Sequence, residues 1–319
     1  MPRITLLDVA KLNGADKEVG LIEEVLTSAP EAEVFPFRTI TGVSYPTVTR
    51  VSFPNVGFRL ANQGVTATKS EFVRKLVEAY IFGGRVEADR AVAMAYDEGM
   101  EAWEMVEALG TFRQSLIRLG SQIWYGISAD AKGFPGIKAA LPFTAGVADG
   151  SVINATGTTA TTASSVYAVK FGKQDVTLVG GNGQVPRLGD FRDETIYDAS
   201  SNPLPGRVAD LIGWIGLQIG NVNCVRRIAN LTADSGKGLT GTLLARLVNS
   251  FPVGYRPDAI FMSRRSREQY QLSMTVVLNG GAGGDPNGKQ TTTAPMPTHY
   301  DNIPIIATDA ILNTDAIEA

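Results

Sequence analysis

The feature that most constrains the fold is a long β pattern near the start of the chain. Apolar or threonine side chains recur at every second position over residues 35–43 and again over 47–53, a period typical of extended strands. Pro54-Asn55 predicts a turn, and the alternation resumes on the way back to Leu60. The sequence therefore predicts a long two-stranded hairpin with polar residues on both faces. Since an isolated hairpin is only marginally stable in water, we expect it to lie on its own domain or on a neighbouring subunit.

A second constraint is an apolar repeat at gaps of three or four residues, which predicts a helix over about 96–124. At 1.5 Å per residue such a helix is roughly 40 Å long. Trp103 and Trp124 within it are expected to anchor the core. The two ends of this helix differ in charge. Arg113 and Arg118 lie in its second half, and its first half carries the acidic residues Asp97, Glu98, Glu101, Glu104 and Glu107. The acidic end either complements the helix dipole or receives a basic partner.

The remainder of the chain mixes strands with shorter helices. An amphipathic stretch precedes Pro30, at residues 17–30. The expected strands are 164–172, a strand-rich run over 213–231, 257–263 and a last buried strand over 302–312. The expected helices are 239–251 and 264–274. The fold class that follows is α+β.

Composition argues against several classes of function. The 319 residues are 44% hydrophobic and 19% charged with a net charge of −3, which describes an ordered globular protein without the basic excess needed for tight nucleic-acid binding. The single histidine, His299, argues against a His-based triad or a multi-His metal site, and Cys224 is expected to be a small buried side chain. We expect no enzyme activity, cofactor or metal. With no signal peptide and no apolar run of roughly 20 residues, we expect a soluble cytoplasmic chain without a membrane span.

One glycine-rich segment resembles a nucleotide-binding loop. Gly283, Gly288 and Lys289 have the G-x-x-x-x-G-K spacing, but Gln290 stands where a Ser or Thr would hold Mg²⁺. Two prolines follow within the next seven residues and would break the required helix. The segment is therefore expected to be a mobile excursion between ordered segments, and not a phosphate site.

Five segments, taken in order, resemble the major capsid proteins of tailed bacteriophages, in the shell fold named after phage Hong Kong 97. They are "PNVGFRLANQG", "GGRVEADRAVA", "IWYGISADAKGFPGI", "SSVYAVKFG" and "GWIGLQIGNVNCVRRIANL". The resemblance implies that the hairpin is an E-loop reaching across an adjacent subunit, and that the long helix is the spine of a peripheral (P) domain. The glycine-rich segment would then be a loop of the axial (A) domain, either near a symmetry axis or exposed on the surface.

The resemblance also implies a division of the chain. In the type member, the strands similar to "SSVYAVKFG" come after the A-domain helices, whereas here they precede them, which indicates a permuted order. The expected parts are an N-arm at 1–36, an E-loop hairpin at 37–71, a P domain at 72–143 and 172–231, and an A domain at 144–171 and 232–319.

The implied function is assembly of identical subunits into the pentamers and hexamers of an icosahedral shell. The shell would enclose double-stranded DNA by weak non-specific contact, in a virion assembled in the host bacterial cytoplasm. Portal protein and separate scaffolding or cement proteins are the expected partners. An encapsulin-type compartment for protein cargo and an enzyme of unrecognised type remain as alternatives.

Complementary charge suggests one contact between subunits. We expect Arg38, Arg50 and Arg59 of the hairpin, with Phe53, to meet the acidic first half of a neighbouring helix. The acidic residues expected there are Asp97, Glu101 and Glu104.

Overall fold

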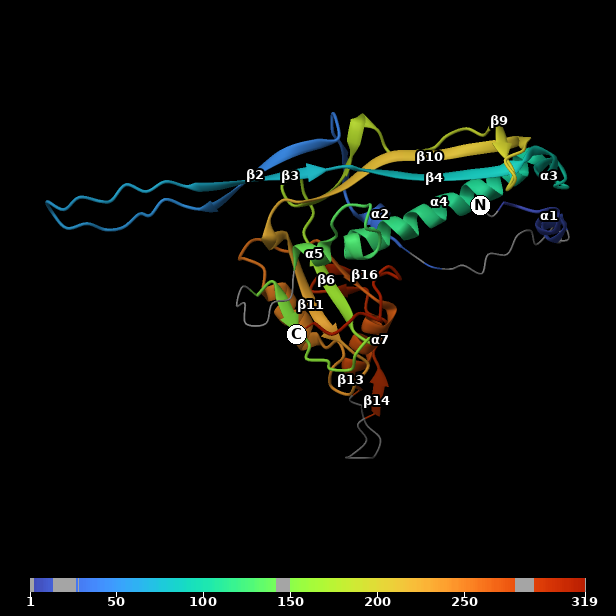
Figure 1. The fold of residues 1–319 in the computed structure, drawn as a ribbon. Helices are drawn as coiled ribbons and strands as arrows, with labels where there is room; N and C mark the ends of the chain where they lie inside the picture. Colours follow the sequence, from blue (N-terminus) through green and yellow to red (C-terminus); the bar gives the residue numbers. More distant parts are fainter. Residues whose placement is uncertain (1–2, 14–26, 28, 142–149, 279–289, 319) are drawn as a thin grey trace.

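The structure is a computed structural model that describes residues 3–13, 27, 29–141, 150–278 and 290–318. A long layer of strands runs above a helix, a smaller lobe lies beneath one end of that layer, and a two-stranded arm extends outward from the same end (Figure 1). The glycine-rich segment 279–289, and all of the stretch 17–30 except residues 27, 29 and 30, lie outside the described residues.

The long layer is a six-stranded sheet, which we call the first sheet. Its strand order is β1-β7-β10-β4, and β8 and β9 also pair with β10. β10 is the central strand, antiparallel to β4 over ten residue pairs from Gly206↔Asp89 to Ile215↔Tyr80. The strands are β1 (Phe37–Thr39), β4 (Tyr80–Asp89), β7 (Val176–Gly180), β8 (Arg187–Leu188), β9 (Arg192–Tyr197) and β10 (Pro203–Ile219).

Helix α4 (Met100–Tyr125) runs along the first sheet and confirms the predicted long helix (Figure 1). It begins later than the apolar repeat because Gly99, with φ +93°, interrupts the helical backbone. It ends at Gly126, where φ is +55° and an added Cβ would lie 2.0 Å from the Gly136 backbone nitrogen. A short helix, α3 (Arg90–Met94), precedes α4, and α1 (Leu6–Asn13) contacts α3.

The smaller lobe contains the second sheet, in the order β15-β16-β12-β6-β11-β5. Its apolar side packs on α6 and α7, whose first turns are capped by the side chains of Thr240 and Ser263. The elements are β5 (Val152–Asn154), β6 (Ser164–Val169), β11 (Val225–Leu231), α6 (Gly241–Asn249), β12 (Ala259–Met262), α7 (Arg264–Ser273), β15 (His299–Tyr300) and β16 (Ile303–Ala307). A separate ribbon pairs β13 (Thr275–Leu278) with β14 (Gln290–Thr293).

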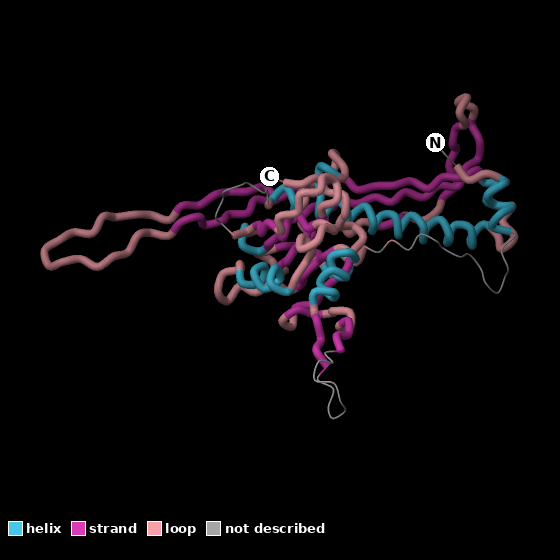
Figure 2. The backbone as a smooth tube through the Cα atoms, turned by 90° about the horizontal axis from the view of Figure 1, so that it is seen from below, coloured by secondary structure: helices cyan, strands magenta, loops and turns pink. Residues whose placement is uncertain are grey.

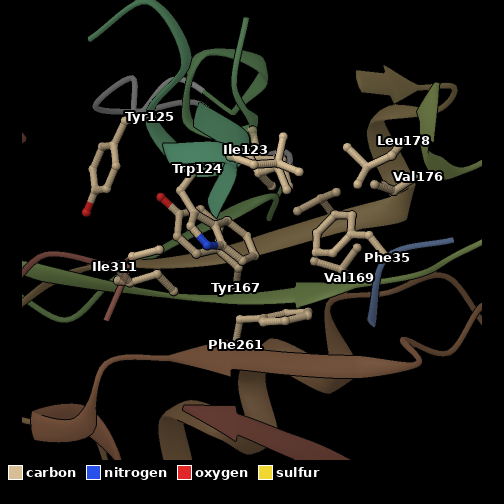
Figure 3. Close-up of a cluster of buried hydrophobic side chains, with 14 of the residues drawn as sticks. Phe35, Ile123, Trp124, Tyr125, Tyr167, Val169, Val176, Leu178, Phe261 and Ile311 are labelled. Carbon is tan, nitrogen blue, oxygen red and sulfur yellow. The ribbon is translucent and has the colours of Figure 1, made fainter. Parts of the chain in front are cut away.

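The largest apolar cluster joins the helix to both sheets. The Trp124 ring stacks on Tyr167 of β6 with centroids 4.7 Å apart, and Phe261 of β12 lies 5.1 Å from Trp124 (Figure 3). Phe35 lies 5.5 Å from Phe261 and brings in the chain just after α2 (Glu31–Val34). Trp103 packs on β4 in a smaller cluster at the far end of the helix. Both tryptophans are thus core anchors, as expected from the sequence.

The predicted hairpin exists, but its turn was misplaced. β2 (Ser44–Ser52) pairs with β3 (Glu71–Glu78), and the intervening residues 53–70 are extended and carry the turn at Leu60–Gln63. Pro54-Asn55 is therefore not the turn, and 56–60 is not the return strand. Residues 37–39 belong to the first sheet instead of the hairpin.

The strand-rich run over 213–231 is divided between the two sheets. β10 ends at Ile219, a short 3₁₀ turn covers Val222–Cys224, and β11 then pairs with β5 and β6. An added Cβ on Gly220 would lie 1.9 Å from the Gln174 carbonyl oxygen, so the chain can turn here only with glycine. Residues 225–231 thus lie in the second sheet, whereas the sequence grouped them with the P-domain segment 172–231.

Candidate functional site

The hairpin arm, defined as residues 44–78, is the most exposed part of the described chain. Between Ser52 and Glu71 its two sides are no longer joined by a strand ladder, and loop replaces strand toward the tip (Figure 2). Asn62, at the tip, has φ +65°, a conformation that asparagine tolerates better than most residues. The arm therefore extends from the body with few contacts of its own.

Large apolar side chains line this arm without covering one another. Phe58 is fully exposed and Val56 is 89% exposed. The other large apolar residues that are exposed on the arm are Val48, Val51, Phe53, Leu60, Val65, Phe72, Val73 and Leu76. So many large apolar side chains exposed on one extension are typical of a protein–protein contact. The arm is accordingly the main candidate site.

The predicted basic residues have different surroundings. The Arg50 guanidinium lies over the rings of Phe53 and Phe72, at 5.4 and 5.3 Å from their centroids. Arg59 donates to the Gln63 carbonyl across the turn, at 3.0 Å. Both belong to the exposed arm. Arg38 does not: it lies in β1 and donates to Gln218 Oε1 at 2.9 Å, so its expected place on the hairpin is wrong.

The acidic end of α4 is also only partly available. Asp97 and Glu101 are exposed. Glu104 instead pairs with Arg207 of β10 at 2.5 Å, which holds α4 to the first sheet of its own chain. Within one chain the arm and the start of α4 lie at opposite ends of the long layer (Figure 1), so any contact between them must join two copies.

An ion-pair lattice at the far end of the first sheet was not predicted. Arg85 pairs with Glu87, Glu194 and Asp210, and Arg192 pairs with the last two of these. Burial opposes ionisation of Glu87, but the guanidinium groups of Arg3 and Arg85 outweigh it and hold the pKa of Glu87 below its usual value. The charges are visible in the sequence as "RVEAD" and "RDE", but these segments lie in β4 and β9 on opposite sides of β10, so Arg85 reaches Glu194 only because of the strand order.

Catalytic chemistry finds little support in the described residues. No cluster of three or more His, Cys, Asp or Glu in the described ranges is arranged to hold a metal. Cys224 is fully buried, and burial raises the pKa of its thiol to about 11, as expected for an inert side chain. His299 is exposed beside Thr298. Among the described helices, none combines the length and hydropathy of a membrane span.

Comparisons with known proteins agree with one another. The family model for major capsid protein GP7 matches residues 16–318. The solved structure of bacteriophage Epsilon15 matches at 17% identity with a TM-score of 0.65, over 100% of this chain and 98% of that one. The capsid of bacteriophage JBD30, decorated with minor capsid protein trimers, matches at 14% identity with a TM-score of 0.54, over 98% of this chain and 100% of that one.

An encapsulin complex from Synechococcus elongatus matches at 8% identity with a TM-score of 0.45, over 72% of this chain and 97% of that one. No curated protein matches the sequence significantly. Because the family model spans almost the full length and the two phage structures share its fold over the whole chain, this chain belongs to the major capsid protein GP7 family and has the Hong Kong 97-type shell fold of tailed bacteriophages.

Proposed function

We propose that the chain assembles with copies of itself into the pentamers and hexamers of an icosahedral shell around double-stranded DNA. The observation that carries this proposal is the hairpin arm, which exposes Phe58 and Val56 on an extension that its own body does not cover. A second copy would bury these side chains, and each subunit of a closed shell offers the same contact to its neighbour.

In this proposal the parts of the chain take the roles that the sequence suggested. Residues 1–36 form the N-arm, and the hairpin arm at 44–78 is the E-loop, in place of the expected 37–71, because residues 37–39 pair with β7 and β3 extends to Glu78. The first sheet with α4 is the P domain, and the second sheet with α6 and α7 is the A domain. The boundary moves so that residues 225–231 join the A domain, because β11 pairs with β5 and β6.

The contact between copies is proposed to join the arm to the exposed start of α4. Arg50, Phe53 and Arg59 of one copy would meet Asp97 and Glu101 of the next. The exposed acids complement the basic arm, which supports this pairing. Arg38 and Glu104 are left out, because Arg38 lies in β1 of the first sheet and Glu104 is half-buried in its ion pair with Arg207.

The remaining partners follow from the same role. A net charge of −3 suits a container that holds DNA by weak, non-specific contacts, since a strongly basic lining would bind it tightly. The protein would be a virion component assembled in the host cytoplasm, with a portal and separate scaffolding or cement proteins as partners. Membership of a capsid family favours this structural role over catalysis.

The proposal is tested by shortening the arm. Replacing residues 53–70 with Asn-Gly would close β2 and β3 by a two-residue turn, since Ser52 already faces Glu71. Full-length and shortened chains are each expressed alone and compared by negative-stain electron microscopy and size-exclusion chromatography. We expect capsomer-based shells, sheets or tubes from the full chain and none from the shortened one, with unchanged circular dichroism.

A point variant gives the matched control. Phe58→Ser should lower the yield of assemblies, whereas Val253→Ser, at a side chain as exposed as Phe58 but outside the arm, should not. Normal shells from the shortened chain would contradict the proposed role of the arm.

A further inference from the structure

A single buried side chain lies where the hairpin arm meets the body. Gln218, near the end of β10, is 2% exposed. Its Oε1 accepts hydrogen bonds from Arg38 Nη2 at 2.9 Å and from the hydroxyl of Tyr45, the second residue of β2. Its Nε2 donates to the carbonyl oxygens of Lys173 and Asp175, at 2.9 and 3.3 Å. The side chain therefore joins the arm, β1 and the turn before β7.

These four partners fix the orientation of the amide. Two donors face the oxygen and two carbonyl acceptors face the nitrogen, so a flipped amide would place like groups against each other at Arg38, Lys173 and Asp175. The Arg38 guanidinium also lies 4.5 Å from the centre of the Tyr45 ring and covers its face. Tyr45 is thus held both through its hydroxyl and through its ring.

Other connections between the arm and the body are few. Thr49 Oγ1 donates to the Gly220 carbonyl at 3.3 Å, and the Tyr80 hydroxyl donates to the Glu78 carboxylate at 3.2 Å. Val77 of β3 is buried at the base of the arm, and β3 continues into β4. Over residues 50–70, all of which the structure describes, the hydrogen bonds of the arm stay within the arm. The direction of the whole extension therefore depends on the contacts at its base, around Tyr45, Thr49 and the buried Val77.

Geometry amplifies any change at this point. From Tyr45 to Asn62 the extended chain spans at most about 56 Å. A rotation of about 5° at Tyr45 would displace such a tip by about 5 Å, more than a residue's rise along a strand. A contact made by the tip on another molecule is lost over such a displacement.

We propose that Gln218 is a positioning residue, which sets the direction of the hairpin arm through its hydrogen bond with Tyr45. Insofar as that direction determines where the arm meets a second copy, the inference rests on the proposed function. The direction itself is a property of one chain and is measured without assembly.

The test uses double electron–electron resonance on the unassembled full chain, isolated by size exclusion. Spin labels are placed at Thr66→Cys, near the tip, and at Glu268→Cys, an exposed position on α7. The native Cys224 is fully buried and does not compete for the label. In Tyr45→Phe, the fraction of molecules with distances outside the native peak should rise about fivefold, because the loss of one ordinary hydrogen bond changes the equilibrium by about that factor. Gln218→Met should broaden the distribution further.

Tyr197→Phe is the matched control, because this tyrosine is 58% exposed and far from the arm, and it should leave the distribution unchanged. Unchanged distributions in both Tyr45→Phe and Gln218→Met would overturn the inference, as would loss of shells in Tyr45→Phe with an unchanged distribution. A broadened distribution with normal shells would support the positioning role and count against the proposed function of the arm.

Discussion

Trp124 Nε1 donates a hydrogen bond to Glu31 Oε1 at 2.7 Å, in the interior where the N-terminal segment crosses the long helix. Glu31 is fully buried, and an added Cβ on Gly120 of α4 would lie 2.9 Å from its other carboxyl oxygen. Burial raises the pKa of Glu31, and the nearby charge of Asp309 adds to that effect. The carboxyl group is thus held where its ionised form is disfavoured.

A pH dependence of stability follows from Glu31. Above its usual pKa of 4.5 the unfolded chain releases this proton while the folded chain retains it, so the contribution of Glu31 to the free energy of unfolding falls as pH rises toward the raised folded pKa. Glu31→Gln keeps an acceptor for Trp124 without the charge. We expect it to raise the melting temperature at pH 8 and to leave it nearly unchanged at pH 4. An equal effect of the substitution at both pH values would show that ionisation of Glu31 is not involved.

Two glycines of α4 should respond in opposite directions to alanine. At Gly110 an added Cβ meets nothing within 4 Å, so Gly110→Ala should stabilise the unassembled chain by about 0.5–1 kcal/mol through helix propensity. At Gly120 the Cβ would lie 3.0 Å from Ala29 and 3.1 Å from Ala310, so Gly120→Ala should destabilise it by about 1–3 kcal/mol. Urea unfolding monitored by circular dichroism measures both. A stabilising Gly120→Ala would contradict the close packing described.

The C-terminal segment is held by an ion pair with a buried arginine. Arg227, 1% exposed, binds both carboxyl oxygens of Glu318, at 2.9 and 2.6 Å. Glu318 is half-buried and also pairs with Lys138 Nζ at 3.2 Å, whereas Arg227 is buried. Removing the carboxylate therefore leaves the buried charge uncompensated, so Glu318→Met should cost about 3 kcal/mol. Arg264→Met, which breaks an exposed pair with Asp309, should change stability by less than about 1 kcal/mol. Equal losses of unfolding free energy in the two variants would mean that burial of Arg227 contributes nothing.

Elements with strong local periodicity were predictable from the sequence. The long helix, α6, α7, β6, β12 and β16 all lie where the apolar pattern placed them. The arm shows where such reasoning fails. The alternation between Phe53 and Leu60 was interpreted as strand pairing, but these side chains face no partner strand, so the pattern cannot report the position of the turn. That position depends on Asn62 and the contact from Gln63 to Leu60.

Long-range pairing limited the prediction of the site. Charge and position indicated an exposed basic hairpin and an acidic helix start, and Arg50, Arg59, Asp97 and Glu101 are exposed as that required. Arg38 and Glu104 bond to Gln218 and Arg207, which lie more than 100 residues away along the chain. No spacing within a segment reveals such partners. The hydrogen bonds of Gln218 were not predicted for the same reason, since the sequence around a glutamine in an apolar strand does not indicate which residues it binds.

Charge exchange tests the proposed contact between copies. If Arg59 of one copy meets Glu101 of the next, Arg59→Glu and Glu101→Arg should each raise the critical concentration for assembly, by about fivefold for a loss of about 1 kcal/mol per contact. The double variant should recover part of the loss, and both single effects should shrink in 1 M salt because exposed charges are then screened. Light scattering against protein concentration measures the critical concentration.

Glu268→Arg, at an exposed acid on α7, is the matched control and should leave the critical concentration unchanged. Shells of normal yield and thermal stability from Arg50→Glu combined with Arg59→Glu would exclude this pairing, and the arm would then bind its neighbour through its apolar side chains alone.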